Sequence, residues 1–183
     1  MPEQLLKTIT RINPQNYREL ELGSVTAITT GCLYPRYEWP QEQLQPFTII
    51  EKIVDDTIIL SGPEYIRVSE REKNKFILKK GDILFRHSAN SLQLGKSVLF
   101  DLNQPVLHTK YLRIRPSADC NSHFLLLVLN LLRSKGKLHF IAHERKNLSV
   151  ILVDDIKKLR IPVPSIEDQI RIAMDHQAEV SFD

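Results

Sequence analysis

Polar side chains that suit the edges of nucleic-acid bases gather in the segment Arg86–Lys96 (RHSANSLQLGK). Arginine pairs well with guanine, and asparagine or glutamine with adenine. We expect this segment to follow a strand as a loop, although serine and asparagine also occur in plain turns, where they bond to their own backbone. The candidate base-reading residues are Arg86, His87, Ser88, Asn90 and Gln93, together with Arg36 and Tyr37 from an earlier loop.

Basic side chains that suit phosphate groups lie in two further segments. On a strand, Lys110–Arg115 (KYLRIR) places its two aliphatic residues on one face and Tyr111, Arg113 and Arg115 on the other. The same alternation is also typical of the solvent-exposed face of an antiparallel sheet. Lys135–Asn147 reads as a basic loop. The candidate phosphate contacts are Lys96, Lys110, Arg113, Arg115, Lys135, Lys137 and Lys146.

Net charge is distributed unevenly along the chain. The whole sequence has a formal net charge of +3, but residues 61–150 carry +9, and residues 1–60 and 151–183 carry −3 each. A continuous basic segment favours an anionic partner such as nucleic acid.

Motifs of the common nucleotide enzymes are missing from the sequence. There is no Gly-x-x-x-x-Gly-Lys phosphate loop, and no Asn/Asp-Pro-Pro-aromatic loop of an adenine methyltransferase. His139 and His143 lie four residues apart, so a metal-dependent nuclease that uses them with Asp155 stays open as an alternative. We nevertheless expect no catalytic residue, no cofactor and no metal.

Length and patterning predict an α+β protein. The 183 residues, 42% of them apolar, fit one globular domain. Phe47–Leu60 has two β-branched runs around Asp55-Asp56, which is typical of a hairpin. Further strands are expected at Tyr65–Val68, Phe76–Leu78, Asp82–Arg86, Lys96–Asp101, Lys110–Arg115 and Leu148–Val153.

Two helices complete the expected fold. Phe124–Leu132 is apolar nearly all round, with Asn121 or Ser122 as N-cap and Gly136 at its end, so this helix should be buried against the sheet. Ser165 should open a final helix in which Ile166, Ile170, Ala173, Gln177 and Val180 have coiled-coil spacing. We therefore predict a twisted, mostly antiparallel, barrel-like sheet packed on a buried helix over residues 1–164. Residues 165–183 would form either a terminal amphipathic helix packed on this domain or the first turns of a longer C-terminal helix.

Cys32 and Cys120 are the only cysteines, too few for a disulfide scaffold. The longest apolar run, Phe124–Leu132, is far shorter than the roughly 20 residues that span a bilayer. We expect a cytoplasmic location and no membrane partner.

Several motifs follow one another in a recognisable order. They are Leu78–Phe85 (LKKGDILF), Gly95-Lys96, the apolar helix, Asn147-Leu148-Ser149, and a tail in which Leu159, Ile161, Pro162 and Pro164 precede Asp168-Gln169 and Ile172-Ala173. This order, from about Leu20 to Ala173, resembles the target recognition domain of a type I restriction-modification specificity subunit. Asp168 departs from the usual Glu, and Val150–Val153 is more apolar than the family's pattern.

The resemblance implies a non-catalytic chain that binds double-stranded DNA and reads one half of a bipartite site. Its partners would be an adenine methyltransferase subunit, indirectly a restriction motor subunit, and, through the C-terminal helix, a second copy of the chain. Gly81 and Asp82 would form the turn into a core strand, and Pro162 and Pro164 a rigid lead into the spacer helix. The alternative is an assembly module, a half-length or degenerate specificity subunit without strong DNA binding of its own.

Overall fold

The computed structural model describes residues 17–32, 42, 44–54 and 56–180, so Arg36 and Tyr37 lie outside the described residues. The strands are β1 (Tyr17–Glu21), β2 (Thr26–Thr29), β3 (Gln45–Val54), β4 (Thr57–Leu60), β5 (Glu64–Ile66), β6 (Ile83–Phe85), β7 (Ser88–Ala89), β8 (Ser97–Leu99), β9 (Val106–Leu107), β10 (Leu112–Pro116), β11 (Ala142–Arg145), β12 (Leu148–Ile151) and β13 (Arg160–Pro164). The helices are α2 (Glu70–Phe76), α3 (Ser122–Ser134), α4 (Val153–Lys157) and α5 (Ile166–Val180), with 3-10 turns η2 (Leu22–Ser24) and η4 (Lys137–Ile141). The α+β class is confirmed, and the described strands form several small sheets without closing into a barrel.

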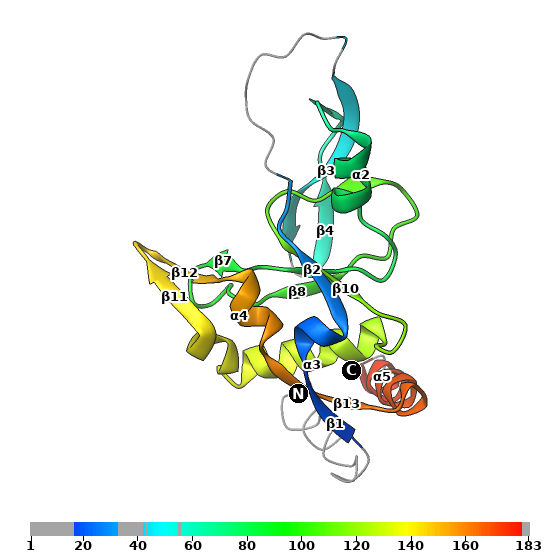
Figure 1. Ribbon diagram of the computed structural model, residues 1–183, viewed down its shortest axis with the longest axis vertical. Helices are drawn as coiled ribbons and strands as arrows, with labels where there is room; N and C mark the ends of the chain where they lie inside the picture. The colour runs from blue at the N-terminus through cyan, green and yellow to red at the C-terminus, as the bar shows by residue number, and fades with distance from the viewer. Residues whose placement is uncertain (1–16, 33–41, 43, 55, 181–183) are drawn as a thin grey trace.

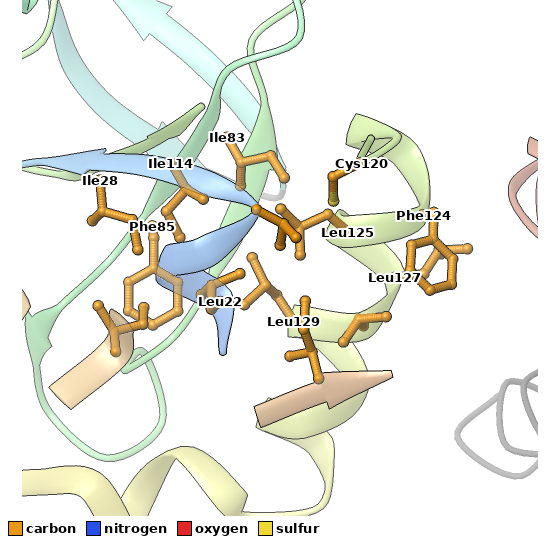
Figure 2. Packing of buried hydrophobic residues seen from close by; sticks show 14 of the residues in the cluster. Leu22, Ile28, Ile83, Phe85, Ile114, Cys120, Phe124, Leu125, Leu127 and Leu129 are labelled. Carbon is orange, nitrogen blue, oxygen red and sulfur yellow. The ribbon is translucent and has the colours of Figure 1, made fainter. Parts of the chain in front are cut away.

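A four-stranded antiparallel sheet in the order β2-β10-β6-β8 lies at the centre of the fold, with α3 running across one face (Figure 1). Ile83, Phe85 and Ile114 of the sheet belong to one buried cluster with Phe124 and Leu125 of α3, and Figure 2 shows Leu125 on the side of the helix that faces the sheet and Phe124 on its other side, next to Leu127. All five side chains are fully buried. Each such side chain contributes on the order of 1.5–3 kcal/mol, so this contact holds the centre of the molecule together.

The other face of the central sheet is covered by a second layer. β3 pairs antiparallel with β4 and β5 and parallel with β9, which confirms the hairpin expected at Phe47–Leu60. Ile50 and the half-buried Ile53 and Ile58 of this layer join a hydrophobic cluster with Leu84 and Tyr111. The central sheet is therefore buried on both faces.

This second layer overturns one expectation about Lys110–Arg115. Tyr111 and Arg113 were expected on a solvent-exposed face, but each is only 4% exposed, because β10 is an inner strand covered on both sides. The alternation itself is correct, since Leu112 and Ile114 face α3. The prediction was wrong about what covers the opposite face.

Helix α3 forms as predicted. The Asn121 side chain accepts a hydrogen bond from the backbone N–H of Phe124 at 3.0 Å and caps the N-terminus. Beyond the C-terminus, Gly136 adopts a left-handed conformation with φ of 69°, a geometry that glycine tolerates best and that commonly ends helices.

Two predicted segments differ in the structure. Phe76–Leu78 was expected as a strand, but Phe76 ends α2, whose N-terminus has a capping box between Ser69 and Glu72. Hydrogen bonds from Ser69 lower the pKa of the Glu72 carboxyl, which favours the charged form that this cap uses. The basic loop expected at Lys135–Asn147 instead contains η4 and β11, and β11 pairs with β12 as a hairpin.

The beginning and the end of the described chain are joined. β1 pairs antiparallel with β13, from Tyr17 opposite Pro164 to Glu21 opposite Arg160. The fully buried side chain of Gln169 in α5 donates to the carbonyls of Pro164 and Asp119 and accepts from the backbone N–H of Asn121. This amide therefore fixes α5 to the N-terminus of α3.

The coiled-coil spacing predicted for the last helix is only partly correct. Ile172 and Ala173 are buried against the rest of the protein, so Ala173 does not belong to an exposed seam. Ile170 and Met174, which are 43% and 63% exposed, form the outward apolar positions of α5.

Candidate nucleic-acid interface

The loop after β6 is closed at its base by backbone hydrogen bonds. The N–H of Gly95 donates to the carbonyl of Arg86 at 2.8 Å, and the N–H of Arg86 to the carbonyl of Lys96 at 2.9 Å. At the tip, the Asn90 side chain accepts from the backbone N–H of Gln93 at 3.1 Å. These hydrogen bonds hold the loop in a defined conformation.

Some of the predicted base-reading side chains in the loop are exposed, and others are partly buried. Ser88 and Asn90 are exposed, while His87 and Gln93 are partly buried. Arg86 donates from Nη2 to the hydroxyl of Tyr111 at 3.2 Å and lies over the Tyr111 ring. Burial lowers the pKa of His87, which favours its neutral form.

The β11–β12 hairpin lies beside this loop (Figure 1). Ser149 of β12 pairs with Ala89 of β7, and Val150 pairs with Ser88. Two segments separated by about sixty residues in the sequence thereby share one small sheet. This pairing could not be predicted from the sequence, because no local pattern specifies which strand joins β7.

Arg133 holds the loop against the end of α3. It donates to the carbonyl of Leu92 at 2.6 Å and to that of Leu94 at 3.2 Å. Gly95, at φ of 74°, is so close that an added Cβ would lie 2.3 Å from Leu138 of η4. The base of the loop therefore packs directly on the segment that carries the predicted lysines.

The predicted phosphate contacts of this region surround the loop and hairpin. Lys135 follows α3, Lys137 begins η4, and Lys146 lies in the hairpin turn with φ of 55°; all three are exposed. Lys96 is half-buried at the base of the loop. We refer to Ser88, Asn90, Gln93, Lys96, Lys135, Lys137 and Lys146 as the loop–hairpin surface.

Phe140 was missed in the sequence, although it lies among basic residues. Its side chain is 83% exposed, and the Lys137 ammonium lies 5.8 Å from the centre of its ring. An exposed aromatic ring within a basic segment offers a stacking surface for a base. The pattern of Phe between lysines and histidines was the signal that would have identified it.

The arginines of β10 are directed into the protein. Arg113 donates to the carbonyl of Lys75, and burial lowers its pKa. Arg115 forms two 2.7 Å bonds to the buried carboxylate of Asp82 and a third bond to the carbonyl of Ile77. Neither arginine is therefore available to bind phosphate as expected, because both side chains are bound to protein groups.

Lys110, at the start of the same segment, is exposed. Its Nζ lies 3.4 Å from the carbonyl of Glu51. It belongs to the β3 side of the molecule and is separate from the loop–hairpin surface.

The histidines considered for a nuclease do not form a metal site. His143 pairs with Asp155 at 2.8 Å, beside an open groove of about 390 Å³, but His139 does not line this groove. Among the residues that the structure describes, no three His, Cys, Asp or Glu side chains lie together in a way that would hold a metal ion. The geometry fits a hydrogen bond between His143 and Asp155 that joins β11 to α4.

Residues 14–174 match the family model described as type I restriction modification DNA specificity domain. The chain belongs to this family. The motif order that suggested it is thus confirmed by a match that covers most of the sequence.

The chain is also similar to individual members. It is 32% identical over 133 residues to a predicted type I restriction enzyme MjaX specificity subunit of Methanocaldococcus jannaschii, covering 70% of this chain and 31% of that protein. The HsdS subunit of Thermoanaerobacter tengcongensis shares the fold with a TM-score of 0.65 at 20% identity, covering 98% of this chain and 43% of that one. A type I restriction-modification S subunit from M. genitalium gives 0.59 at 17% identity, covering 91% and 40%.

The chain spans less than half the length of each of these proteins.

Within the described ranges, no helix is both long and apolar enough to cross a membrane. Both cysteines are buried and unpaired, and burial raises the pKa of Cys120 to about 11.

Proposed function

We propose that this specificity domain binds double-stranded DNA in a sequence-dependent manner and reads one half of a target site without performing catalysis. The observation that supports this best is the pairing of β7 with β12. This pairing brings the polar loop beside the basic hairpin, and in our proposal the candidate base-reading and phosphate-binding side chains act from these two neighbouring segments. Membership of the specificity-domain family supports the same function.

In this proposal the side chains divide by chemistry. Lys96, Lys135, Lys137 and Lys146 bind phosphates, which fixes the position of the duplex without selecting a sequence. Ser88, Asn90 and Gln93 approach base edges in the major groove, with His87 and Arg86 behind them. Arg36 and Tyr37 remain candidates in a segment that the structure does not describe. Lys110 would be a peripheral contact.

The chemistry on DNA would be carried out by partners. We propose that the chain directs an adenine methyltransferase subunit and, indirectly, a restriction subunit in the cytoplasm. Residues 1–164 would form the recognition domain, and the helix from residue 165 would begin the segment that meets the partner or a second copy.

Salt dependence tests DNA binding directly. Neutralising about four phosphates predicts a log-log slope of affinity against salt of roughly −3.6. Fluorescence anisotropy with a random-sequence duplex measures this slope for the full chain. The variant K137A/K146A should lower its magnitude by about 2, whereas K52A, an exposed lysine on β3, should leave it nearly unchanged. Absent or salt-independent binding would contradict the proposal.

A second candidate function is assembly. The outward apolar side chains of α5, Ile170 and Met174, are spaced by one helical turn and suit a helical partner. Under this alternative, the chain co-purifies with a methyltransferase subunit but has no measurable affinity for duplex DNA. Loss of co-purification in I170E/M174E, with DNA binding absent in the unmodified chain, would favour assembly over recognition.

A further inference from the structure

Helix α2 is held at both ends by hydrogen bonds. At its N-terminus, Ser69 and Glu72 form the reciprocal capping box. At its C-terminus, three successive carbonyls accept bonds from side chains of the neighbouring β9–β10 segment: Lys75 from Arg113, Phe76 from His108 and Ile77 from Arg115. Cationic side chains at this end also suit the negative pole of the helix. A helix of only seven residues is therefore fixed at both of its ends.

One side of α2 is anchored and the other is exposed. Phe76 is buried in a cluster with residues of β3, β5 and β9, and Lys73 leans over Phe47. Arg71, Asn74 and Lys75 are all exposed. Arg71 and Asn74, three residues apart, lie on the side away from Phe76, and Lys75 lies at the edge of that side, next to the Phe76 ring. The structure therefore presents an Arg, an Asn and a Lys on one rigid helical face.

This face is positively charged because the two acidic residues of α2 are engaged elsewhere. Glu70 pairs with Lys73, and Glu72 bonds back to Ser69. Among the described residues, neither Arg71 nor Lys75 forms an ion pair within 4 Å, although the charge of Lys75 helps to lower the pKa of Glu72 and its ammonium lies over the ring of Phe76. Residues 67–80 contain six basic and two acidic side chains. An anionic partner fits this face by charge.

We propose that α2 is a second base-reading element, which enters the major groove of duplex DNA with Arg71 and Asn74 directed at base edges. The inference rests on the DNA binding proposed above. An α-helix fits the major groove, and arginine and asparagine make the bidentate contacts that distinguish guanine and adenine there. The two anchored ends keep the helix ordered before it meets DNA, so little ordering entropy is lost on binding.

Geometry predicts which part of the site α2 reads. Seven residues rise about 10 Å along the helix, which corresponds to roughly three base pairs of duplex. In Figure 1, α2 lies beside β3 at one end of the molecule, away from β7 and the β11–β12 hairpin. The positions read by α2 should therefore differ from those read by Asn90 and Gln93.

Selection of duplexes from a random library by the full chain tests the inference. R71A and N74A should each reduce the preference at one of two or three adjacent positions by about 5- to 100-fold. N90A/Q93A should alter other positions, and K137A should weaken binding while leaving the consensus intact. R18A, which removes an exposed arginine on β1 at the other end of the molecule, is the matched control.

The outcomes separate this inference from the proposed function. An unchanged consensus in R71A and N74A would overturn the role of α2, and so would uniform weakening with the consensus intact, which would make the helix a phosphate contact only. If the unmodified chain binds no duplex at all, the DNA-binding function itself fails, and the reading role fails with it.

Discussion

The buried carboxylate of Asp82 offers the sharpest test of the fold, because it supports α2 through Arg115. Asp82 is 1% exposed and accepts three hydrogen bonds: two at 2.7 Å from Arg115 and one at 2.8 Å from the backbone N–H of Lys79. D82A removes all three and leaves the arginine charge without its partner. Removing one member of a buried pair costs about 3–5 kcal/mol.

The expected loss lies at the lower end of that range. The Arg115 side chain is 25% exposed, so water can reach the unpaired guanidinium. We therefore expect the free energy of unfolding to fall by about 3 kcal/mol, which for a chain of this size lowers Tm by about 6–12 °C. Amide exchange should also accelerate at the C-terminus of α2, since the carbonyl of Ile77 is bonded to the same arginine.

Urea unfolding of D82A, R115M and the double variant measures the coupling between the two side chains. The double variant should lose at least about 1 kcal/mol less than the sum of the single losses. D101A, which breaks the exposed Lys80–Asp101 pair, should change the stability by less than about 1 kcal/mol. Additive losses, or a D82A effect no larger than that of D101A, would refute the role assigned to Asp82.

Three further predictions follow from local geometry. G95A should cost about 2 kcal/mol and weaken duplex binding several-fold, because its Cβ would collide with Leu138 at a positive φ. Q169L should cost about 2–3 kcal/mol and accelerate amide exchange in α5, because it removes three buried hydrogen bonds. Burial lowers the pKa of the His108 imidazole. As the pH falls below about 6.5, this imidazole therefore gains a proton in the unfolded chain but stays neutral in the folded one. Stability should therefore decrease toward acid, and H108Q should flatten that decrease.

Each of these predictions has a control. G62A replaces another glycine, where an added Cβ would meet no atom within 4 Å apart from its two chain neighbours, and should be nearly neutral. For Q169L, exchange in β3 should remain slow, and a uniform increase over the whole chain would contradict a local effect. For H108Q, an unchanged pH dependence between about pH 7 and 5 would assign the acid lability to other groups.

The buried helix was predictable because its signals are local. Asn121, the continuous apolar run and Gly136 specify the start, burial and end of α3 within one short segment. The capping box of α2 was equally local: Ser69 and Glu72 stand three residues apart in the sequence. The prediction of a strand at Phe76–Leu78 was wrong because the apolar run of these three residues is typical of a strand, whereas the cap at Ser69 and Glu72 begins a helix that extends to Phe76.

The environment of Lys110–Arg115 could not be predicted in the same way. A period of two shows that Arg113 lies opposite Ile114, but it does not show which layer covers each face. That information comes from the β3–β4 hairpin, more than fifty residues earlier in the chain. The neighbourhood of the Arg86–Lys96 loop was hidden for a similar reason, since β7 pairs with the distant β12. Candidate residue types were visible in the sequence, whereas their grouping depended on non-local pairing.

Around the Arg86–Lys96 loop and the end of α2, arginines and lysines of the basic segment differ in what they contact. Four arginines there bind protein groups: Arg86 binds Tyr111, Arg113 and Arg115 bind the end of α2, and Arg133 binds the loop. The lysines Lys135, Lys137 and Lys146 remain exposed. The planar guanidinium suits several fixed acceptors at once, whereas the ammonium is a hydrated point charge that suits a phosphate.

This division makes arginine and lysine unequal in the two roles. R133K keeps the charge but cannot span the carbonyls of both Leu92 and Leu94, so the loop should loosen and duplex affinity should fall several-fold. K137R keeps an exposed cation at an outward position and should bind duplex as the unmodified chain does. Anisotropy titrations at one salt concentration compare the two variants, and equal affinities would show that Arg133 contributes only charge. In that case the total positive charge, and not the geometry of the loop, would determine the affinity for duplex DNA.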